Sequence, residues 1–298
     1  MKDLPRRILV PTDFSDTADR ALLVARQLAT ALAAEIHVVH VRILLEDPHL
    51  VEEHQLELER LLTRGDQKTR EVLSRHVSSE TSVVVHPHLV RGLSASESIV
   101  EAAGDLGCDL IVIGTHGRRG IKHLLLGSVT EAVVRSSSIP VLTVRGDAVL
   151  SGEPAARILV PHDFSEHSLP AVQLAAHWAR HVGAHVTLLH VVEPVVYPEF
   201  YAVDLMPNDM LHRVVERSRE ALQKVAQEQL EGVSNSVEVV TGRATEAITE
   251  FAQPARYDLI VMPTRGLSAL EHLILGSVAE AVLRRSRIPV LTIRAHRD

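Results

Sequence analysis

The chain has 298 residues, which is enough for two ordinary domains, each with a core of its own. Its formal net charge is −7 and only 3% of its residues are aromatic, so the sequence predicts neither the basic surface nor the stacking side chains that nucleic acids require. No apolar run of about 18 residues is present that would span a membrane, and no apolar leader follows Met1. We therefore expect a cytoplasmic protein with no nucleic-acid or membrane partner.

The sequence contains one long internal repeat. The segment RILVPTDFS at 7–15 recurs as RILVPHDFS at 157–165, and the block 123–145 recurs with few changes at 272–294. A period of about 150 residues is too long for a solenoid, so each copy should be a complete domain. Gly, Ser and Pro residues between the copies are typical of an exposed linker. The predicted domains are 1–147 and 155–298.

Each copy alternates short apolar runs with longer segments of helical spacing. The apolar runs are rich in β-branched residues, which is typical of parallel strands buried on both faces. Between them, apolar residues recur at helical spacing, as at 18–32. This alternation predicts an α/β fold with two tandem, doubly wound, parallel five-stranded sheets. The predicted strands are 8–10, 36–41, 83–85, 110–113 and 141–144 in the first copy, and 158–160, 185–192, 237–240, 259–262 and 290–293 in the second.

A glycine-rich segment follows the predicted strand at 110–113. In such sheets ligands bind outside the carboxyl ends of the strands, so the segments after strands one and four are the places to look. Gly114 and Gly117 let backbone N–H groups approach an anion closely, because no Cβ intervenes. A helix that opens at Ser128, just after Gly127, adds unpaired N–H groups and the positive end of its dipole. Together these features predict a phosphate-binding loop.

The same helix start has a second interpretation. Ser128 and Glu131 have the spacing of a capping box, in which the two side chains bond the first N–H groups of their own helix. Ser277 and Glu280 repeat this spacing, so we expect such caps in both copies. A cap alone does not account for the two glycines upstream.

The spacing Gly114-x2-Gly117-x9-Gly127-Ser128 resembles the nucleotide motif of the universal stress protein family. The opening strand ILVPTDFS, the closing SSIPVLTVR and the duplication resemble that family as well, so the similarity runs through the whole chain. The resemblance implies a three-layer α/β sandwich of the adenine nucleotide α-hydrolase or flavodoxin type. It also implies ATP, with Mg²⁺, as the ligand.

The resemblance further implies which residues of the first copy contact ATP. The adenosine would be held by Pro11, Thr12, Asp13 and Val41, with Ile113 and Gly114 beside the ribose. The phosphates would lie on Gly117, Arg118, Gly127, Ser128, Val129 and Thr130. Asp13 has the alternative role of capping the helix that follows it.

The second copy departs from the motif. Pro263 stands where Gly114 stands in the first copy, and proline has no N–H and a fixed φ. His162 replaces Thr12. The motif residues that remain, as weaker candidates, are Asp163, Gly266, Gly276 and Ser277. We expect this copy to bind nucleotide weakly or not at all, and to serve mainly as a structural partner of the first.

Other residues have less specific interpretations. Cys108 precedes an apolar run and is expected to be a buried, unreactive thiol. The 18 histidines include pairs such as His86 with His88, but no HxxxH or CxxC spacing is present. We therefore expect no metal site and keep zinc as the alternative. The aromatic segment 194–201 is expected to pack over a neighbouring helix, with a lid as the alternative.

Three functions fit these patterns. The first is an ATP-binding regulatory protein of the stress response, in which nucleotide biases the conformation or association of paired domains. The second is a slow ATPase, with low turnover because no convincing base, arginine finger or Walker lysine is present. The third is an interaction module without nucleotide. The resemblance also implies that the two copies pair through their last strands, 141–144 and 290–293, in a chain that forms a homodimer.

Overall fold

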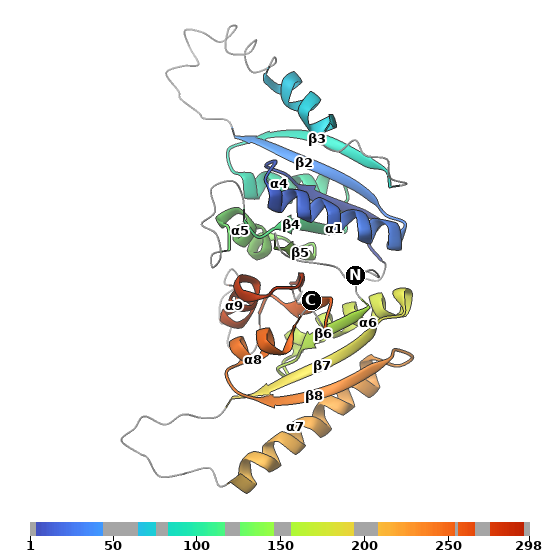
Figure 1. Cartoon of the computed structure of the whole chain (residues 1–298), viewed down its shortest axis with the longest axis vertical. Helices are drawn as coiled ribbons and strands as arrows, with labels where there is room; N and C mark the ends of the chain where they lie inside the picture. Colours follow the sequence, from blue (N-terminus) through green and yellow to red (C-terminus); the bar gives the residue numbers. More distant parts are fainter. Residues whose placement is uncertain are drawn as a thin grey trace, which may run out of the picture. The chain divides into compact units, whose positions relative to one another are not determined.

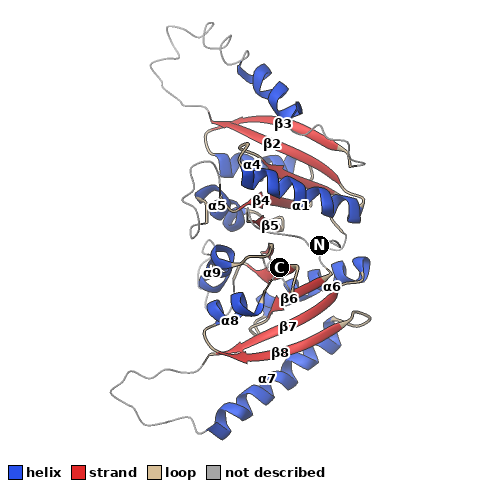
Figure 2. Cartoon of the chain, viewed as in Figure 1, coloured by secondary structure: helices blue, strands red, loops and turns tan. Residues whose placement is uncertain are grey.

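The computed structural model describes residues 4–43, 65–75, 83–116, 126–145, 156–193, 208–253, 256–265 and 275–294. The chain divides into two compact units: the first consists of Pro5–Gly146, and the second contains Asp147–Asp298. Each unit is built from parallel strands and covering helices, which Figure 2 distinguishes by colour. No helix within the described ranges is long and apolar enough to cross a membrane.

The first unit has one parallel sheet in the strand order β3-β2-β1-β4-β5 (Figure 1). Helix α1 covers one face and helices α4 and α5 cover the other, so the predicted doubly wound sheet is confirmed. A further helical segment spans 65–75. The elements are β1 (Arg7–Pro11), α1 (Asp16–Leu32), β2 (Glu35–Ile43), β3 (Val85–Gly92), α4 (Ala95–Asp105), β4 (Leu110–Gly114), α5 (Ser128–Ser136) and β5 (Val141–Val144).

The second unit repeats this topology, with the order β8-β7-β6-β9-β10 and parallel pairing throughout. Its first crossover begins with a short 3₁₀ turn, η1, before the α-helix. The elements are β6 (Arg157–Pro161), η1 (Glu166–Ser168), α6 (Leu169–Val182), β7 (His185–Val192), α7 (Asn208–Gln229), β8 (Asn235–Thr241), α8 (Ala244–Phe251), β9 (Leu259–Pro263), α9 (Ser277–Arg285) and β10 (Val290–Ile293).

The central strands form the core of each unit. Residues 8–10 of β1, 110–112 of β4 and 158–160 of β6 have 0% exposed surface. Each side chain of this size contributes about 1.5–3 kcal/mol when it leaves water. Because helices cover both faces, these strands contain uninterrupted apolar runs, which is why the sequence identifies them.

The third strand differs from its prediction. The apolar run 83–85 predicts a strand there, but β3 begins at its last residue and extends over Val85–Gly92. Val84 is 58% exposed, whereas the strand itself contains polar residues such as His86 and His88. A strand at the end of the sheet order is only half covered, so polar alternation marks it better than an apolar run.

Cys108 is buried, with 5% of its surface exposed, as the sequence predicts. Burial, together with the neighbouring Asp109 carboxylate, raises the pKa of its thiol to about 11. The thiolate is the reactive form of cysteine, and at pH 8 it would make up roughly one thousandth of the population.

We therefore expect the native protein to react very slowly with a disulfide reagent such as dithionitrobenzoate at pH 8. The same protein in concentrated guanidinium chloride should release one equivalent of the coloured product, since the chain has 1 Cys. Fast labelling of the folded protein would contradict the buried position of this thiol.

Gly114, at the end of β4, lies against the first turn of α1. A Cβ placed there would be 2.9 Å from both the carbonyl oxygen and the Cγ2 atom of Thr17. The backbone oxygen cannot move aside without displacing the helix, so this position requires glycine for packing. In the second unit the corresponding residue is Pro263, and β9 is contacted both by α6 and by the 3₁₀ turn η1. His167, the repeat equivalent of Thr17, lies in η1, where the first unit has an α-helical turn. We infer that the change of helix type accommodates the proline.

The substitution Gly114→Ala should lower the free energy of unfolding of the first unit by about 1–3 kcal/mol, because the added methyl group overpacks the contact with α1. Gly104→Ala is the matched control: it lies in α4 with no heavy atom within 4 Å of the added Cβ. It should leave stability unchanged or raise it by up to about 1 kcal/mol.

Two spectroscopic signals distinguish the unfolding of the two units in urea. Circular dichroism reports both, whereas the fluorescence of Trp178, the single tryptophan, reports the second unit alone. Gly114→Ala should shift the transition measured by circular dichroism and leave the transition measured by Trp178 fluorescence in place. Equal stability of the Gly114→Ala and Gly104→Ala variants would contradict the packing role.

Candidate functional site

The central strands of the first unit separate at their carboxyl ends. Strands β1 and β4 pair only through Ile8 with Leu110 and Leu9 with Ile111, although both strands continue beyond these pairs. Beyond the second pair the two strands no longer pair with each other. Because β1 pairs with β2 on its other side, this is the point where the strand order reverses and where ligands bind in such sheets.

Hydrogen bonds of its own side chains and to β2 hold the loop after β1. The Thr12 N–H donates to the Val39 carbonyl at 2.8 Å, and the Thr12 hydroxyl accepts from the Phe14 N–H at 3.0 Å. The Asp13 Oδ1 atom accepts from the Ser15 N–H at 3.1 Å. These bonds hold Phe14 in the left-handed region, with φ 61°. The N-cap of α1 is Ser15, whose side chain accepts from the Ala18 N–H, so Asp13 stabilises the turn without being the N-cap.

His40 fixes this loop from the neighbouring strand. Its Nδ1 lies 2.7 Å from the Thr12 carbonyl oxygen, to which it donates, and its ring packs on Phe14 with centroids 4.8 Å apart. Val41 follows it on β2, two residues past Val39, where the register with β1 ends. Sequence reasoning assigned His40 no such role. The signal was available, because the repeat places His190 at the equivalent position.

Helix α5 begins at Ser128 with three backbone donors available. Gly127 is the N-cap residue: its N–H donates to the Thr115 carbonyl at 2.8 Å, and its carbonyl accepts from the Glu131 N–H. As a glycine it has no side chain to cap the helix, and the same holds for Gly276 at the start of α9. The predicted capping boxes are therefore wrong, because Ser128 and its counterpart are the first helical residues and not the N-caps.

The free donors are the N–H groups of Ser128, Val129 and Thr130, which have no partner within the described part of the chain. Ser128 and Val129 are exposed. The Thr130 side chain is 4% exposed and its hydroxyl donates to the Gly114 carbonyl at 2.7 Å. This bond ties the start of α5 to the end of β4, so the helix terminus faces the edge where β1 and β4 separate.

The structure thus brings most of the predicted residues of the first unit to the carboxyl edge of the sheet. Two of them have structural roles that the sequence did not indicate, since Gly114 makes room for α1 and the Gly127 N–H is used by Thr115. Ile113 is 5% exposed and belongs to the core. Residues Gly117, Arg118 and Gly266, together with the aromatic segment 194–201, lie outside the described residues.

The second unit repeats the frame of this site. Strands β6 and β9 pair only through Ile158 with Leu259 and Leu159 with Ile260 before they separate. At the start of α9, the Gly276 N–H donates to a threonine carbonyl at 2.8 Å, as Gly127 does in the first unit.

The loop after β6 makes hydrogen bonds equivalent to those of the loop after β1. His162 Nδ1 accepts from the Phe164 N–H at 3.0 Å, as the Thr12 hydroxyl does in the first unit, and φ of Phe164 is 61°. The Asp163 Oδ1 atom accepts from Ser165 at 3.1 Å, and His190 Nδ1 donates to the His162 carbonyl at 2.8 Å.

A cavity of about 200 Å³ occupies this edge of the second unit. Its walls come from the ends of β6, β7 and β9 and from helices α8 and α9, and most of them are apolar. Asp163, Gly276 and Ser277, three of the weaker candidates, line it together with His162. The apolar side chains are Pro161, Leu189, Val191, Ile248, Met262 and Pro263.

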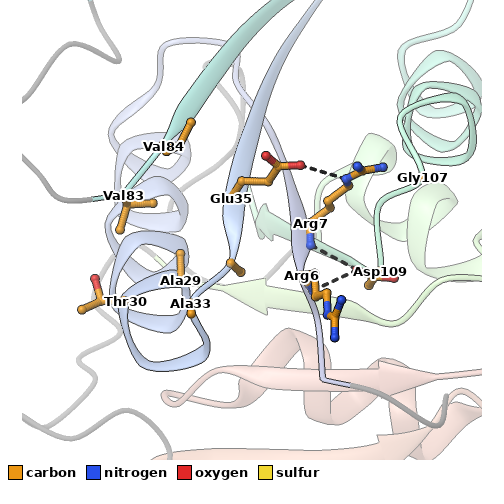
Figure 3. A pocket seen from close by; sticks show the side chains of 11 residues that line it. Arg6, Arg7, Ala29, Thr30, Ala33, Glu35, Val83, Val84, Gly107 and Asp109 are labelled. Atoms are coloured by element: carbon orange, nitrogen blue, oxygen red, sulfur yellow. Dashed lines mark hydrogen bonds and ion pairs between the residues drawn. The ribbon is translucent and has the colours of Figure 1, made fainter.

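A larger depression of about 740 Å³ lies at the opposite, amino-terminal edge of the first unit. Figure 3 shows Arg7 between Glu35 and Asp109 in its wall. Arg7 Nε donates to Glu35 at 2.8 Å, and the Asp109 carboxylate accepts from the backbone N–H groups of Arg6 and Arg7. These contacts join β1 to β2 and to the start of β4, so their role in the fold is evident without a ligand.

Three histidines of the first unit form a cluster on β2 and β3. His37 Nδ1 lies 3.0 Å from His88 Nε2, and the Glu35 carboxylate lies 3.4 Å from both His37 and His86. Burial, followed by the charges of His37 and His86, lowers the pKa of His88. Among the described residues no group of three or more His, Cys, Asp or Glu is arranged to hold a metal ion.

Comparison with known proteins gives matches over both units. Residues 5–145 and 155–294 each match the Universal stress protein family. Universal stress protein MJ0577 of Methanocaldococcus jannaschii is 35% identical over 160 residues, which cover 49% of this chain and 98% of that protein. Universal stress protein MJ0531 of the same organism is 34% identical over 146 residues, covering 48% and 84%.

Among solved structures, a universal stress protein from Archaeoglobus fulgidus aligns with a TM-score of 0.64 at 22% identity, covering 97% of this chain and 98% of that one. At this identity the likeness concerns the fold, and it extends over both units. The sequence matches carry the assignment, since together they include nearly the whole chain. The chain belongs to the universal stress protein family and contains two copies of its domain in tandem.

Proposed function

We propose that the first unit binds ATP, with the phosphates on the start of α5 and the adenosine at the edge where β1 and β4 separate. The observation that carries this proposal is the set of three unpartnered N–H groups at Ser128, Val129 and Thr130. Backbone donors at a helix start, with the positive end of the helix dipole behind them, bind phosphate groups. Membership of the universal stress protein family supports the same ligand class.

The loop after β1 is suited to receive the adenosine. Its backbone is fixed by bonds from Thr12 to Val39 and from His40 to Thr12, so little order has to be imposed when a ligand binds. The Asp13 carboxylate accepts from the Ser15 N–H, and a carboxylate has about four lone-pair sites, so it can also accept from a ribose hydroxyl or an adenine amino group. Pro11 and Val41 offer apolar surface beside it.

The proposal also includes two residues outside the described ranges, a metal ion and a regulatory effect. Gly117 and Arg118 would complete the phosphate site. Mg²⁺ would be held chiefly by the phosphate oxygens, as is usual for this ion. Bound ATP stabilises the conformation that binds it, so nucleotide would regulate this protein in the stress response by shifting conformation or association.

The substitution Val129→Glu provides a direct test. Val129 is the second residue of α5 and is 37% exposed, so a carboxylate there favours the helix but repels phosphate. We expect ATP affinity, measured by isothermal titration calorimetry with Mg²⁺, to fall at least tenfold while the melting temperature stays within a few degrees of the wild-type value.

Val278→Glu is the matched control, since Val278 has the same position in α9. It should leave one ATP bound per chain at the wild-type affinity. If Val129→Glu binds ATP as tightly as the wild-type protein, the phosphate site is not at α5. If the wild-type protein itself binds no ATP, the interaction module without nucleotide becomes the better description.

Three further assignments stay predictions. They are the pairing of the two copies through the strands at 141–144 and 290–293, the homodimer, and the cytoplasmic location. Sedimentation of the wild-type protein with and without ATP would report the oligomeric state and any effect of nucleotide on it.

A further inference from the structure

The histidine cluster of the first unit, which consists of His37, His86 and His88, lies on one face of the two outer strands. Strand β3 ends the sheet order and, among the described strands, pairs only with β2 (Figure 1). The ring centroids of His86 and His88 lie 5.0 Å and 5.1 Å from that of His37. His37 itself is 8% exposed. The cluster therefore connects the edge strand to the sheet at a site that is partly withdrawn from water.

Hydrogen bonds link the cluster to one carboxylate. His37 Nδ1 lies 3.0 Å from His88 Nε2, and His37 Nε2 lies 3.4 Å from Glu35 Oε1. The other oxygen of Glu35 lies 3.4 Å from His86 Nε2. Because an ionised carboxylate only accepts hydrogen bonds, the two histidines that face Glu35 carry a proton on Nε2.

The bond between His37 and His88 needs one ring nitrogen without a proton. A neutral imidazole supplies this nitrogen, and the bond can therefore form when both rings are neutral or when only one of them is charged. When both rings are charged, two N–H groups face each other across 3.0 Å. Two positive charges then also share a partly buried site. The second proton thus replaces the hydrogen bond with repulsion.

The Glu35 carboxylate offsets little of this added charge, because Arg7 already pairs with it. Arg7 Nε on β1 donates to Glu35 at 2.8 Å, as Figure 3 shows. Burial opposes ionisation of Glu35, but hydrogen bonds from His37 and Arg7 lower its pKa. The carboxylate therefore stays ionised while the histidines titrate, and each proton that they take up adds to the net positive charge of the group.

Other charged groups near the cluster come from three elements. Asp109, at the start of β4, accepts from the backbone of β1 beside Arg7. Glu101 and Asp105 of α4, and Arg70 of the segment 65–75, line the same depression as His88. None of these four groups forms an ion pair with a histidine of the cluster in the described part of the chain.

A second contact between β2 and β3 lies on the opposite face of the sheet. Side chains alternate along a strand, so Arg42 and Arg91 point away from the cluster, and both donate to the buried Asp66. Burial opposes ionisation of Asp66, but these two bonds lower its pKa. This contact therefore persists through the pH range in which imidazoles titrate, and mild acid acts on the histidine face alone.

The equivalent positions of the second unit hold a different set of side chains. His185 stands in the place of Glu35, and Thr187 pairs with Ser236 where His37 pairs with His86. The two ring nitrogens of His185 lie 2.8 Å and 2.9 Å from serine hydroxyls. A hydroxyl can donate or accept, so these bonds survive when the ring gains a proton. The second unit is thus an internal control for the first.

We propose that the histidine cluster is a proton-sensitive contact, which holds β3 on β2 at neutral pH and releases this edge strand in mild acid. The observation that carries the proposal is the bond between His37 and His88, beside a carboxylate that is already paired. The first unit would then respond to acidification, whereas the second would not. The proposal does not depend on ATP, because the cluster is tested without nucleotide.

The direction of the effect follows from the pKa of His88. Burial, followed by the charges of His37 and His86, lowers this pKa from its ordinary value of 6.5. The folded unit therefore binds fewer protons than the unfolded chain in this range. Its stability at the edge is fully present above pH 6.5 and decreases as the pH falls from there towards the lowered pKa.

Amide hydrogen exchange of the full chain, followed by mass spectrometry, provides the test. Exchange is measured without nucleotide at pH 7.5 and pH 5.5, with EDTA present, and is corrected for the intrinsic effect of pH on amide exchange. We expect the protection of β3 to fall about tenfold or more at the lower pH, since one pKa unit corresponds to a factor of about ten. Protection of β8, its equivalent in the second unit, should stay within about twofold.

His88→Gln is the variant that tests the cluster itself. The glutamine amide can donate to His37 Nδ1 but takes up no proton, so β3 should keep its protection at pH 7.5 and lose most of the fall at pH 5.5. His185→Gln is the matched control, because it removes the imidazole at the edge of the second unit. It should leave the acid response of β3 as large as in the wild-type protein.

Three results would overturn the proposal. The first is equal protection of β3 at the two pH values in the wild-type protein. The second is a fall in His88→Gln as large as that of the wild-type protein, which would assign the response to other groups. The third is an equal fall in β3 and β8, which would indicate general loosening of the chain in acid. Failure of ATP binding would affect none of these measurements.

Discussion

The early separation of the central strand pair is the constraint on which each unit depends. After two residue pairs, β1 and β4 no longer share hydrogen bonds, and β6 and β9 behave in the same way. The backbone groups beyond that point must find other partners. They find them in the turn after the first strand, in a histidine of the second strand and in the start of a helix, so the sheet topology itself produces an edge with backbone donors.

The two units satisfy this constraint with different side chains. In the first unit a hydroxyl accepts the hydrogen bond that closes the turn, and in the second unit an imidazole nitrogen accepts it. The fold of the turn is the same, down to a phenylalanine at φ 61° in both. Since the backbone is already fixed, a substitution at this position changes the chemistry of the edge without changing its shape.

The fold follows closely from the sequence, because apolar runs and helical spacing are local signals. The predicted position of β3 was wrong because a half-covered strand has a weaker apolar pattern than a fully buried one. The motif spacing located the candidate phosphate site, but the capping boxes were wrong because the sequence does not reveal which residue turns first into the helix. The role of His40 depends on a contact with a distant segment, for which the only sequence signal was its recurrence as His190 in the second copy.

The contact between Gly114 and Thr17 means that the first glycine of the nucleotide motif also has a packing role. The missing Cβ makes room for a neighbouring helix, and the second unit has a proline at this position where that helix begins with a 3₁₀ turn. Loss of this glycine in a homologue therefore reports first on the local geometry of a crossover. By itself, such a loss is therefore poor evidence that a ligand is no longer bound.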